Sequence, residues 1–194
     1  MAEVINIALA GVGGQGIVMA GNIISSAALC AGYDVKKNEL HGMAQRGGSV
    51  VSEVRFGKKI FSPVIPDGEV DILLALEMLE GLRYAHLLRD GGMIIADELR
   101  IPPAVKPAGA PDYPADIVQQ LKRAAKKVLL IPAAKLAAEA GNARAANTVL
   151  LGALSRQLDL PPAAWHAALQ TSLKPALVEV NLKAFDLGRK FRRK

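Results

Sequence analysis

A glycine-rich stretch close to the amino terminus has the composition of a turn that contacts a ligand or another protein. GVGGQG occupies residues 11–16, between the apolar runs VINIALA and IVMAGNIISSAALCA. Glycine permits a positive φ and a close approach by another molecule, and a turn into a helix presents free N–H groups at the positive end of the helix dipole. The stretch predicts a cradle for an anion such as phosphate, a bare surface for a partner protein, or a tight turn whose glycines serve packing alone.

The same spelling matches the dinucleotide fingerprint G-x-G-x-x-G, which requires an acidic residue about 20 positions further on. Glu39 and Asp34 are candidates for that acid, and Lys36 and Lys37 would suit a 2′-phosphate. A stand-alone NAD(P)-dependent dehydrogenase is therefore one open interpretation, although it explains neither Gln15 nor the stretch after Glu39.

A second group of reactive or ligand-binding types lies in HGMAQRGGSVVSEVRFG, residues 41–57. Arg46 precedes Gly47 and Gly48, and an arginine beside flexible backbone offers a planar fork for phosphate or carboxylate. His41 has no nucleophile or carboxylate beside it in the sequence, which favours a loop residue over an acid–base group. We therefore expect a binding role here and no catalytic residue.

Composition and charge restrict the class of protein. The only cysteine, Cys30, excludes an internal disulfide and an iron–sulfur cluster held by this chain alone, and it favours a reducing, cytoplasmic setting. Five of the 24 basic residues lie in the closing GRKFRRK, which leaves 19 basic against 18 acidic side chains. A basic nucleic-acid-binding surface is therefore not indicated, and the tail is either a solvated end or an arm for an acidic partner.

Residues 4–33 contain no charged side chain, yet they do not predict a membrane segment. The glycine stretch divides this run, and the part from Ile17 to Ala31 has 15 residues, whereas a spanning helix needs about 20. Glu3 stands where a signal peptide would carry basic residues. We expect this segment to lie in the protein interior.

The apolar patterns of the sequence predict the strands and helices on either side of these residues. Buried strands are predicted for VINIALA, VDILLALE, GGMIIADE and KVLLIP, a further strand for YDVKKNEL, and helices for Ile17–Ala31 and Met78–Arg89. GSVVSEVRFG alternates, which predicts a half-exposed strand with Val51, Glu53 and Arg55 on one side, and GKK after it predicts a hairpin turn. The proline-rich residues 98–115 predict a loop, and the chain after Pro132 is helical.

This alternation of strands and helices predicts an α/β protein: a three-layer α/β/α, Rossmann-like domain with a mostly parallel sheet, one hairpin addition and a helical C-terminal segment. We expect a single domain over residues 1–194, with the α/β core at about 1–140 and the helical extension at about 141–194. The apolar stripe Leu177, Val180, Ala184 and Leu187 must pack either on its own core or on a partner chain.

Several motifs, taken together and in order, resemble the gamma-type component of 2-oxoacid:ferredoxin oxidoreductases. They are GVGGQG, HGMAQRGGSVVSEVRFG, SPVIPDGEVDILLALE and NTVLLGAL, and the closing VNLKAFDLG is most similar to the beta subunits of the indolepyruvate branch. The resemblance covers nearly the whole chain apart from the proline-rich segment.

The resemblance implies a heteromeric enzyme that converts a 2-oxo acid (indolepyruvate or another aryl or branched oxo acid), coenzyme A and oxidised ferredoxin into acyl-CoA, carbon dioxide and reduced ferredoxin. Thiamine diphosphate, magnesium and the iron–sulfur clusters are then expected on a large partner subunit, because this chain has one cysteine and no G-D-G motif followed by asparagine. Ferredoxin would be met indirectly, and the isolated chain would be inactive. A ligand-free scaffold subunit is the remaining alternative.

On this basis, the expected coenzyme A cradle consists of Gly11, Gly13, Gly14, Gln15 and Gly16, with Arg46, Gly47 and Gly48 opposite. Gln15 would offer its amide to the ligand or to a partner loop. Asn147 in NTVLLGAL matches the family pattern, although an amide that caps or bridges helices is the better explanation of this residue.

Overall fold

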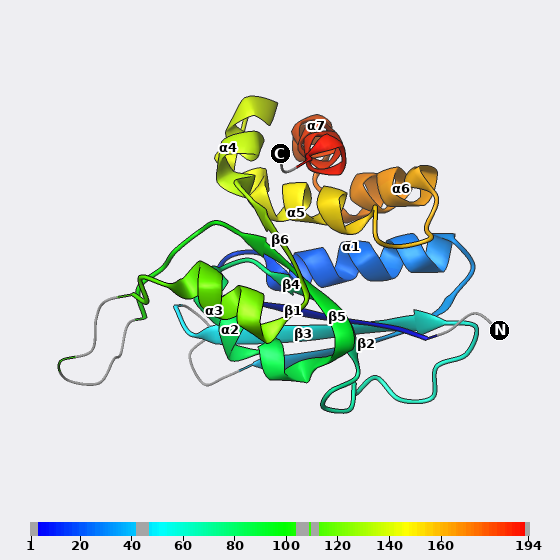
Figure 1. Cartoon of the computed structure of the whole chain (residues 1–194). Coiled ribbons are helices and arrows are strands. Elements are labelled where there is room, and N and C mark those ends of the chain that lie inside the picture. Colours follow the sequence, from blue (N-terminus) through cyan, green and yellow to red (C-terminus); the bar gives the residue numbers. More distant parts are fainter. Residues whose placement is uncertain (1–3, 42–46, 104–108, 110–112, 193–194) are drawn as a thin grey trace.

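The computed structural model describes residues 4–41, 47–103, 109 and 113–192. In this part of the chain six strands form one sheet in the order β2-β3-β1-β4-β5-β6 (Figure 1). Strands β1, β4, β5 and β6 are parallel, whereas β3 runs antiparallel to both β1 and β2. The strands are β1 (Ile5–Val12), β2 (Asp34–His41), β3 (Ser49–Gly57), β4 (Val70–Ala75), β5 (Leu88–Asp97) and β6 (Lys127–Ile131).

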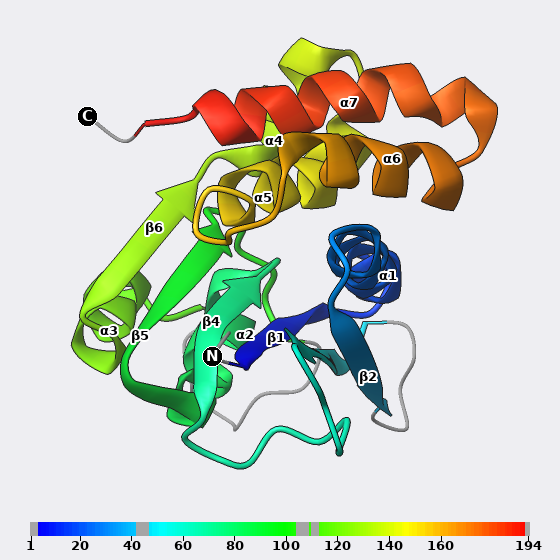
Figure 2. The same cartoon turned by 90° about the vertical axis from the view of Figure 1, so that its right-hand side faces the viewer.

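Helices cover both faces of this sheet, which confirms the predicted α/β/α class. Figure 2 shows α1, α5, α6 and α7 on one side of the strands, and Figure 1 shows α2 and α3 side by side on the other. The helices are α1 (Ile17–Cys30), α2 (Met78–Arg83), α3 (Ile117–Ala124), α4 (Ala133–Ala140), α5 (Ala146–Leu154), α6 (Pro162–Ser172) and α7 (Pro175–Lys190). None of the described helices is both long and apolar enough to cross a membrane.

The central position of β1 in the sheet explains why its sequence is almost wholly apolar. Side chains of a strand alternate between the two faces of the sheet. Ile7 and Leu9 join the core cluster formed with α1 and the C-terminal helices, whereas Ala8 and Ala10 join the cluster under α2 and α3. Because both faces are covered, β1 has no polar side, as expected for such a strand.

Helices α5 and α7 cross each other at very short distance. A Cβ atom on Gly152 would lie 2.0 Å from the carbonyl oxygen of Phe185, and one on Gly188 would lie 1.9 Å from that of Val149. The two backbones are therefore in direct contact. Ala184 and Phe185 of α7 are buried, so this part of the helix packs on its own core, whereas Leu177 is exposed.

The predicted half-exposed character of β3 was wrong. Val51 and Glu53 are buried, because their face of β3 is covered as well as the face under α1. On their side the chain after β3 folds back, and the Ile65 N–H points at Glu53 Oε2 at 3.4 Å. An alternating pattern does not reveal whether a later segment of the chain covers the polar face of a strand, as the segment with Ile65 does here.

Two further predictions, one of a turn and one of a helix end, were also wrong. GKK is not a hairpin turn, because residues 58–69 lead to β4, which pairs with β1, and the hairpin partner of β3 is β2. The helix predicted to reach Arg89 ends at Arg83 and is followed by a 3₁₀ turn at Ala85–Leu87. It stops early because Leu88 already pairs with Val70 at the start of β4.

Candidate functional site

The glycine stretch forms the turn between β1 and α1, and its glycines serve different purposes. Gly14 and Gly16 have φ values of 104° and 80°, in the left-handed region that favours glycine. A Cβ on Gly16 would lie 2.5 Å from Asn147 Nδ2, and a Cβ on Gly11 would lie 2.7 Å from Gln15 Oε1. Gly14, in contrast, is exposed and faces open space.

Gln15 holds this turn against the next parallel strand. Its side-chain Oε1 accepts a hydrogen bond from the Val12 N–H at 2.6 Å, and its Nε2 donates to the carbonyl of Leu76 at 2.8 Å. The amide therefore links the end of β1 to the end of β4. This contact gives Gln15 a positioning role in the turn, and its remaining N–H is the one that a ligand or partner could use.

The turn also pairs with the segment that precedes β3. The Gly13 N–H donates to the Gly48 carbonyl at 2.8 Å, and the Gly47 N–H lies 3.5 Å from the Gly13 carbonyl. The structure thus brings Gly47 and Gly48 beside the glycine stretch, as the expected cradle requires. Arg46 lies outside the described residues, as does the side chain of His41.

A pocket of about 360 Å³ opens beside the turn, where the carboxyl ends of β1, β4 and β5 meet the start of α5. Open α/β sheets place ligands at this edge. Of the predicted cradle, Gly14 and Gln15 line the pocket, whereas the other described glycines of the cradle are not part of its lining. The lining consists of Gly14, Gln15, Leu76, Asp97, Leu99, Ala134, Ala143, Arg144, Ala146, Asn147 and Leu150.

Asp97 is a pocket residue that the sequence analysis missed. It ends β5, is 4% exposed, and its Oδ1 accepts the Ala133 N–H at 3.1 Å. Burial raises the pKa of its carboxyl from 3.8 to about 6, although hydrogen bonds from the backbone of Ala133, Glu98 and Leu99 oppose the rise. A signal was present in the sequence, since an acid directly after an apolar strand stands at the edge where ligands bind.

Arg144 supplies positive charge at the pocket and was also missed. It lies in the 3₁₀ turn Ala143–Ala145 that leads into α5, and its side chain is exposed. In the part of the chain that the structure describes, its guanidinium forms no hydrogen bond or ion pair with another side chain. Asn147, in the first turn of α5, completes the polar lining. The pocket therefore combines a cation, an amide and a buried carboxylate.

The geometry argues against a dinucleotide at the glycine stretch. In a dinucleotide-binding fold, the acid that binds the ribose stands at the end of a parallel strand next to β1. Here the neighbour of β1 on the side away from β4 is the antiparallel β3. Asp34 starts β2 at the opposite edge of the sheet, where it accepts the Ile60 N–H at 2.8 Å. Glu39 pairs in register with Ser52 and is thus two strands away from β1.

Comparison with known proteins places this fold in a defined group. Residues 6–191 match the family described as pyruvate ferredoxin/flavodoxin oxidoreductase. Indolepyruvate oxidoreductase subunit IorB of Pyrococcus horikoshii is 43% identical over 190 residues, with 94% of this chain and 93% of the relative covered.

Solved structures agree with that result. The gamma subunit of a keto/oxoacid ferredoxin oxidoreductase from Geobacter sulfurreducens aligns with a TM-score of 0.72 and 28% identity over 95% of both chains. The 2-oxoglutarate:ferredoxin oxidoreductase of Magnetococcus marinus, solved with 2-oxoglutarate, coenzyme A and succinyl-CoA, shares the fold with a TM-score of 0.70 and 23% identity. The match covers 96% of this chain but 30% of that one.

Proposed function

Because the chain belongs to the pyruvate ferredoxin/flavodoxin oxidoreductase family, as a small subunit of a heteromeric 2-oxoacid:ferredoxin oxidoreductase, we propose that its pocket binds coenzyme A. The bound coenzyme would then be presented to the active site of a larger partner subunit. The observation that carries this proposal is the pocket itself, in which Gly14 lies open and Arg144 has a guanidinium available for a ligand.

The chemistry of the lining suits the two ends of such a ligand. Coenzyme A carries a diphosphate and a 3′-phosphate, and a guanidinium binds phosphate through paired, charge-assisted hydrogen bonds. Arg144, the Asn147 amide and the main chain of Gly14 supply the donors. Asp97 supplies an acceptor on the same wall, which favours a hydroxyl or amino group there and repels a second phosphate. Charge would thus orient the ligand within the pocket.

The redox and decarboxylation steps belong to the partner in this proposal, because the residues of this chain do not fit the groups that perform them. An iron–sulfur cluster needs about four thiolates, and the single cysteine, Cys30, is exposed at the end of α1. The sequence most similar to the G-D-G motif that binds magnesium and diphosphate is DGG at residues 90–92. There the Asp90 carboxylate pairs with Lys126 at 3.1 Å on the surface.

Calorimetric titration of the full-length chain with coenzyme A tests the proposal. We expect saturable binding, and Arg144→Ala should weaken it by about 1–3 kcal/mol, the scale for losing a charged hydrogen bond. Arg123→Ala is the matched control, because Arg123 lies in the last turn of α3, away from the pocket lining, and should leave the affinity unchanged.

Other ligands and the partner separate the alternatives. NADH binding with turnover of a hydroxy acid by the lone chain would favour a dehydrogenase. Absence of coenzyme A binding by both the chain and its complex with the larger subunit, while the two proteins still assemble, would favour a scaffold without a ligand. Assays of the assembled complex with indolepyruvate, pyruvate and branched oxo acids would then identify the substrate.

A further inference from the structure

The end of α7 gathers positive charge around a second cavity, of about 550 Å³. Pockets for small molecules have this size, about 300–1,000 Å³. We infer that this cavity, the α7 pocket, binds a small molecule that carries a diphosphate or a comparable multivalent phosphate group. The inference is independent of the coenzyme A proposal, because the two pockets share no lining residue. The α7 pocket is lined by Pro162, His166, Asp186, Arg189, Lys190 and Arg192.

Three guanidinium groups meet beside this pocket, and the protein holds each of them. Arg189 Nη1 donates to the hydroxyl oxygen of Ser155 at 2.9 Å, and Ser155 is 2% exposed. Arg156 Nη1 donates to the Phe191 carbonyl at 3.0 Å, and Arg192 Nη1 donates to the same carbonyl at 3.3 Å. These bonds use one nitrogen of each guanidinium. Because a guanidinium has five N–H donors in all, donors remain for a ligand.

The ends of two helices bring these like charges together. Ser155 and Phe191 are the C-terminal caps of α5 and α7, and the carbonyl groups at a helix C-terminus attract cations. The arginines still repel one another. Desolvation, and then the charges of Arg192 and Arg189, lower the pKa of the Arg156 guanidinium. A bound anion would offset this repulsion.

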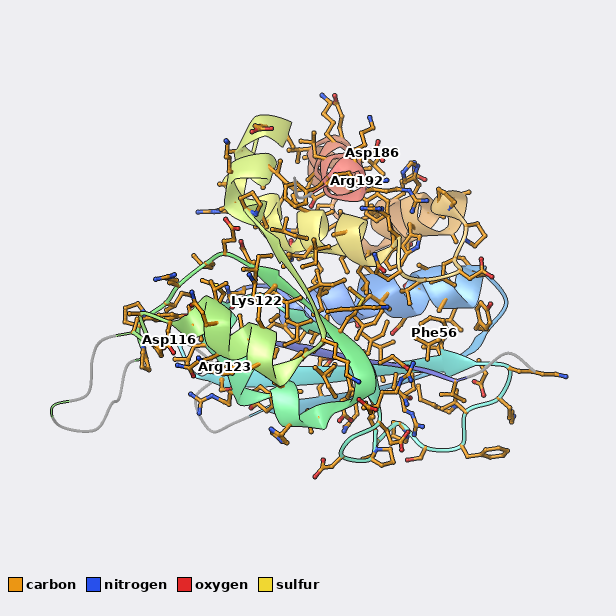
Figure 3. All side chains as sticks on the ribbon, in the orientation of Figure 1. Phe56, Asp116, Lys122, Arg123, Asp186 and Arg192 are labelled. Carbon is orange, nitrogen blue, oxygen red and sulfur yellow. The ribbon has the colours of Figure 1, made fainter. Side chains whose placement is uncertain are left out.

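Acidic side chains do not balance the charge of the α7 pocket. Asp186 is the only acid among the described residues that line it, and its Oδ1 lies 3.5 Å from His166 Nε2. Figure 3 shows Asp186 close to Arg192. Asp159 lies in the connection between α5 and α6, outside the lining. These two acids face Lys190 and the three arginines, so the pocket keeps a net positive charge.

The arrangement of the charges favours a phosphate-bearing small molecule. A guanidinium binds phosphate oxygens through paired, charge-assisted hydrogen bonds, and a diphosphate offers oxygens to several cations at once. The cations converge on one cavity, whereas a nucleic acid requires a basic patch or stripe that follows its backbone. Pro162, at the start of α6, adds an apolar wall for the remainder of the molecule.

The two pockets lie at opposite ends of α5. Asn147, in the first turn of that helix, lines the pocket at the glycine stretch, whereas Arg156 follows its C-terminal cap beside the α7 pocket. The nine residues of α5 span about 13 Å. Removing the cation of the first pocket, Arg144, therefore leaves the α7 pocket intact and separates the two sites in an experiment.

Calorimetric titration of the full-length Arg144→Ala variant with inorganic pyrophosphate tests the inference. At constant ionic strength we expect saturable binding, with a lower Kd for pyrophosphate than for inorganic phosphate. Adding Lys190→Gln or Arg192→Gln should raise the Kd for pyrophosphate at least about threefold, because each removes a charged donor. Adding Arg123→Gln is the matched control. Arg123 lies on α3, which Figure 3 shows well apart from Arg192, and this change should leave the Kd unchanged.

Two further measurements keep the result interpretable. The thermal unfolding midpoint of each variant should match that of its parent, because the side chains of Lys190 and Arg192 are exposed. Pyrophosphate should shift the amide resonances of residues 189–192 and of His166, and leave that of Gly14 unmoved.

Three results would overturn the inference. They are the absence of saturable pyrophosphate binding, an unchanged Kd in both Lys190→Gln and Arg192→Gln, and amide shifts confined to another part of the chain. If pyrophosphate does not bind while the same two variants lose affinity for the larger subunit, the charges serve an acidic protein surface and the inference is wrong.

Discussion

Gly16 and Asn147 meet so closely that no side chain fits between them: a Cβ on Gly16 would lie 2.5 Å from Asn147 Nδ2. The two residues come from motifs far apart in the sequence, at the starts of α1 and α5. This contact sets the side chain of Asn147 at the wall of the pocket, so that the glycine stretch and NTVLLGAL form one site.

Gly16→Ala should therefore cost more stability than Gly14→Ala. Both positions have a positive φ, which costs about 1–2 kcal/mol for a residue with a Cβ. Gly14 faces open space, whereas alanine at Gly16 must also displace Asn147. Urea unfolding of the two variants measures the difference, and Gly16→Ala/Asn147→Ala should recover the part due to the clash. Equal losses of unfolding free energy in the two single variants would show that the contact between Gly16 and Asn147 does not affect stability.

Asp97 should make the protein less stable as the pH rises. Its folded pKa of about 6 exceeds the ordinary value of 3.8, so the folded state binds a proton more tightly than the unfolded state. The stability that this group contributes is full below about pH 4 and is lost as the pH rises through 6. The loss amounts to about 3 kcal/mol, at 1.36 kcal/mol per pKa unit.

Asp97→Asn isolates this contribution. The difference in unfolding free energy between wild type and variant should change by that amount between pH 4 and pH 7.5, with the variant the more stable at the higher pH. The side-chain oxygen of the asparagine can still accept the hydrogen bond from the Ala133 N–H. A difference that stays constant with pH would mean that Asp97 titrates normally.

The crossing of α5 and α7 should tolerate no enlargement. Gly188→Ala places a Cβ within 1.9 Å of the Val149 carbonyl oxygen, so the helices must separate, and overpacking of this kind costs about 1–3 kcal/mol or more. Gly21→Ala is the control, because Gly21 is also inside a helix but its nearest neighbour is the Ser52 hydroxyl at 3.1 Å. Chemical denaturation should show a large loss of unfolding free energy for Gly188→Ala and not for Gly21→Ala.

Removing the Gln15 amide should loosen the turn without unfolding the protein. Gln15→Ala leaves the Val12 N–H and the Leu76 carbonyl without their partner, at a cost of about 1–3 kcal/mol. Amide hydrogen exchange should accelerate at Val12 and through the turn, while β5 and β6 keep their protection. Unchanged exchange at Val12 would contradict the positioning role.

The sequence alone predicted the parts of the site that are local. A glycine-rich turn between an apolar strand and an apolar helix follows from short-range rules, and β1, the turn and α1 lie where these rules place them. The pairing of Gly13 with Gly48 was expected only through a family resemblance, since nothing in the spacing joins them. Arg46 remains a prediction.

What the sequence could not supply depends on how distant segments of the chain come together. Asp97 and Arg144 enter the pocket because the end of β5 and the approach to α5 reach the same edge as the glycine stretch. Glu53 is buried because the segment after β3 folds back over that face of the strand, where the Ile65 N–H lies 3.4 Å from Glu53 Oε2. Neither fact is encoded in a window of neighbouring residues, since both depend on the path of the whole chain.

The most direct test of coenzyme A binding in this pocket is an amide chemical-shift titration of the full-length chain with coenzyme A. We expect the largest changes on Gly14, on residues 143–147 and on Asp97 at the end of β5. Saturable binding whose shift changes lie on another face of the sheet, with Gly14 and Arg144 unmoved, would contradict it.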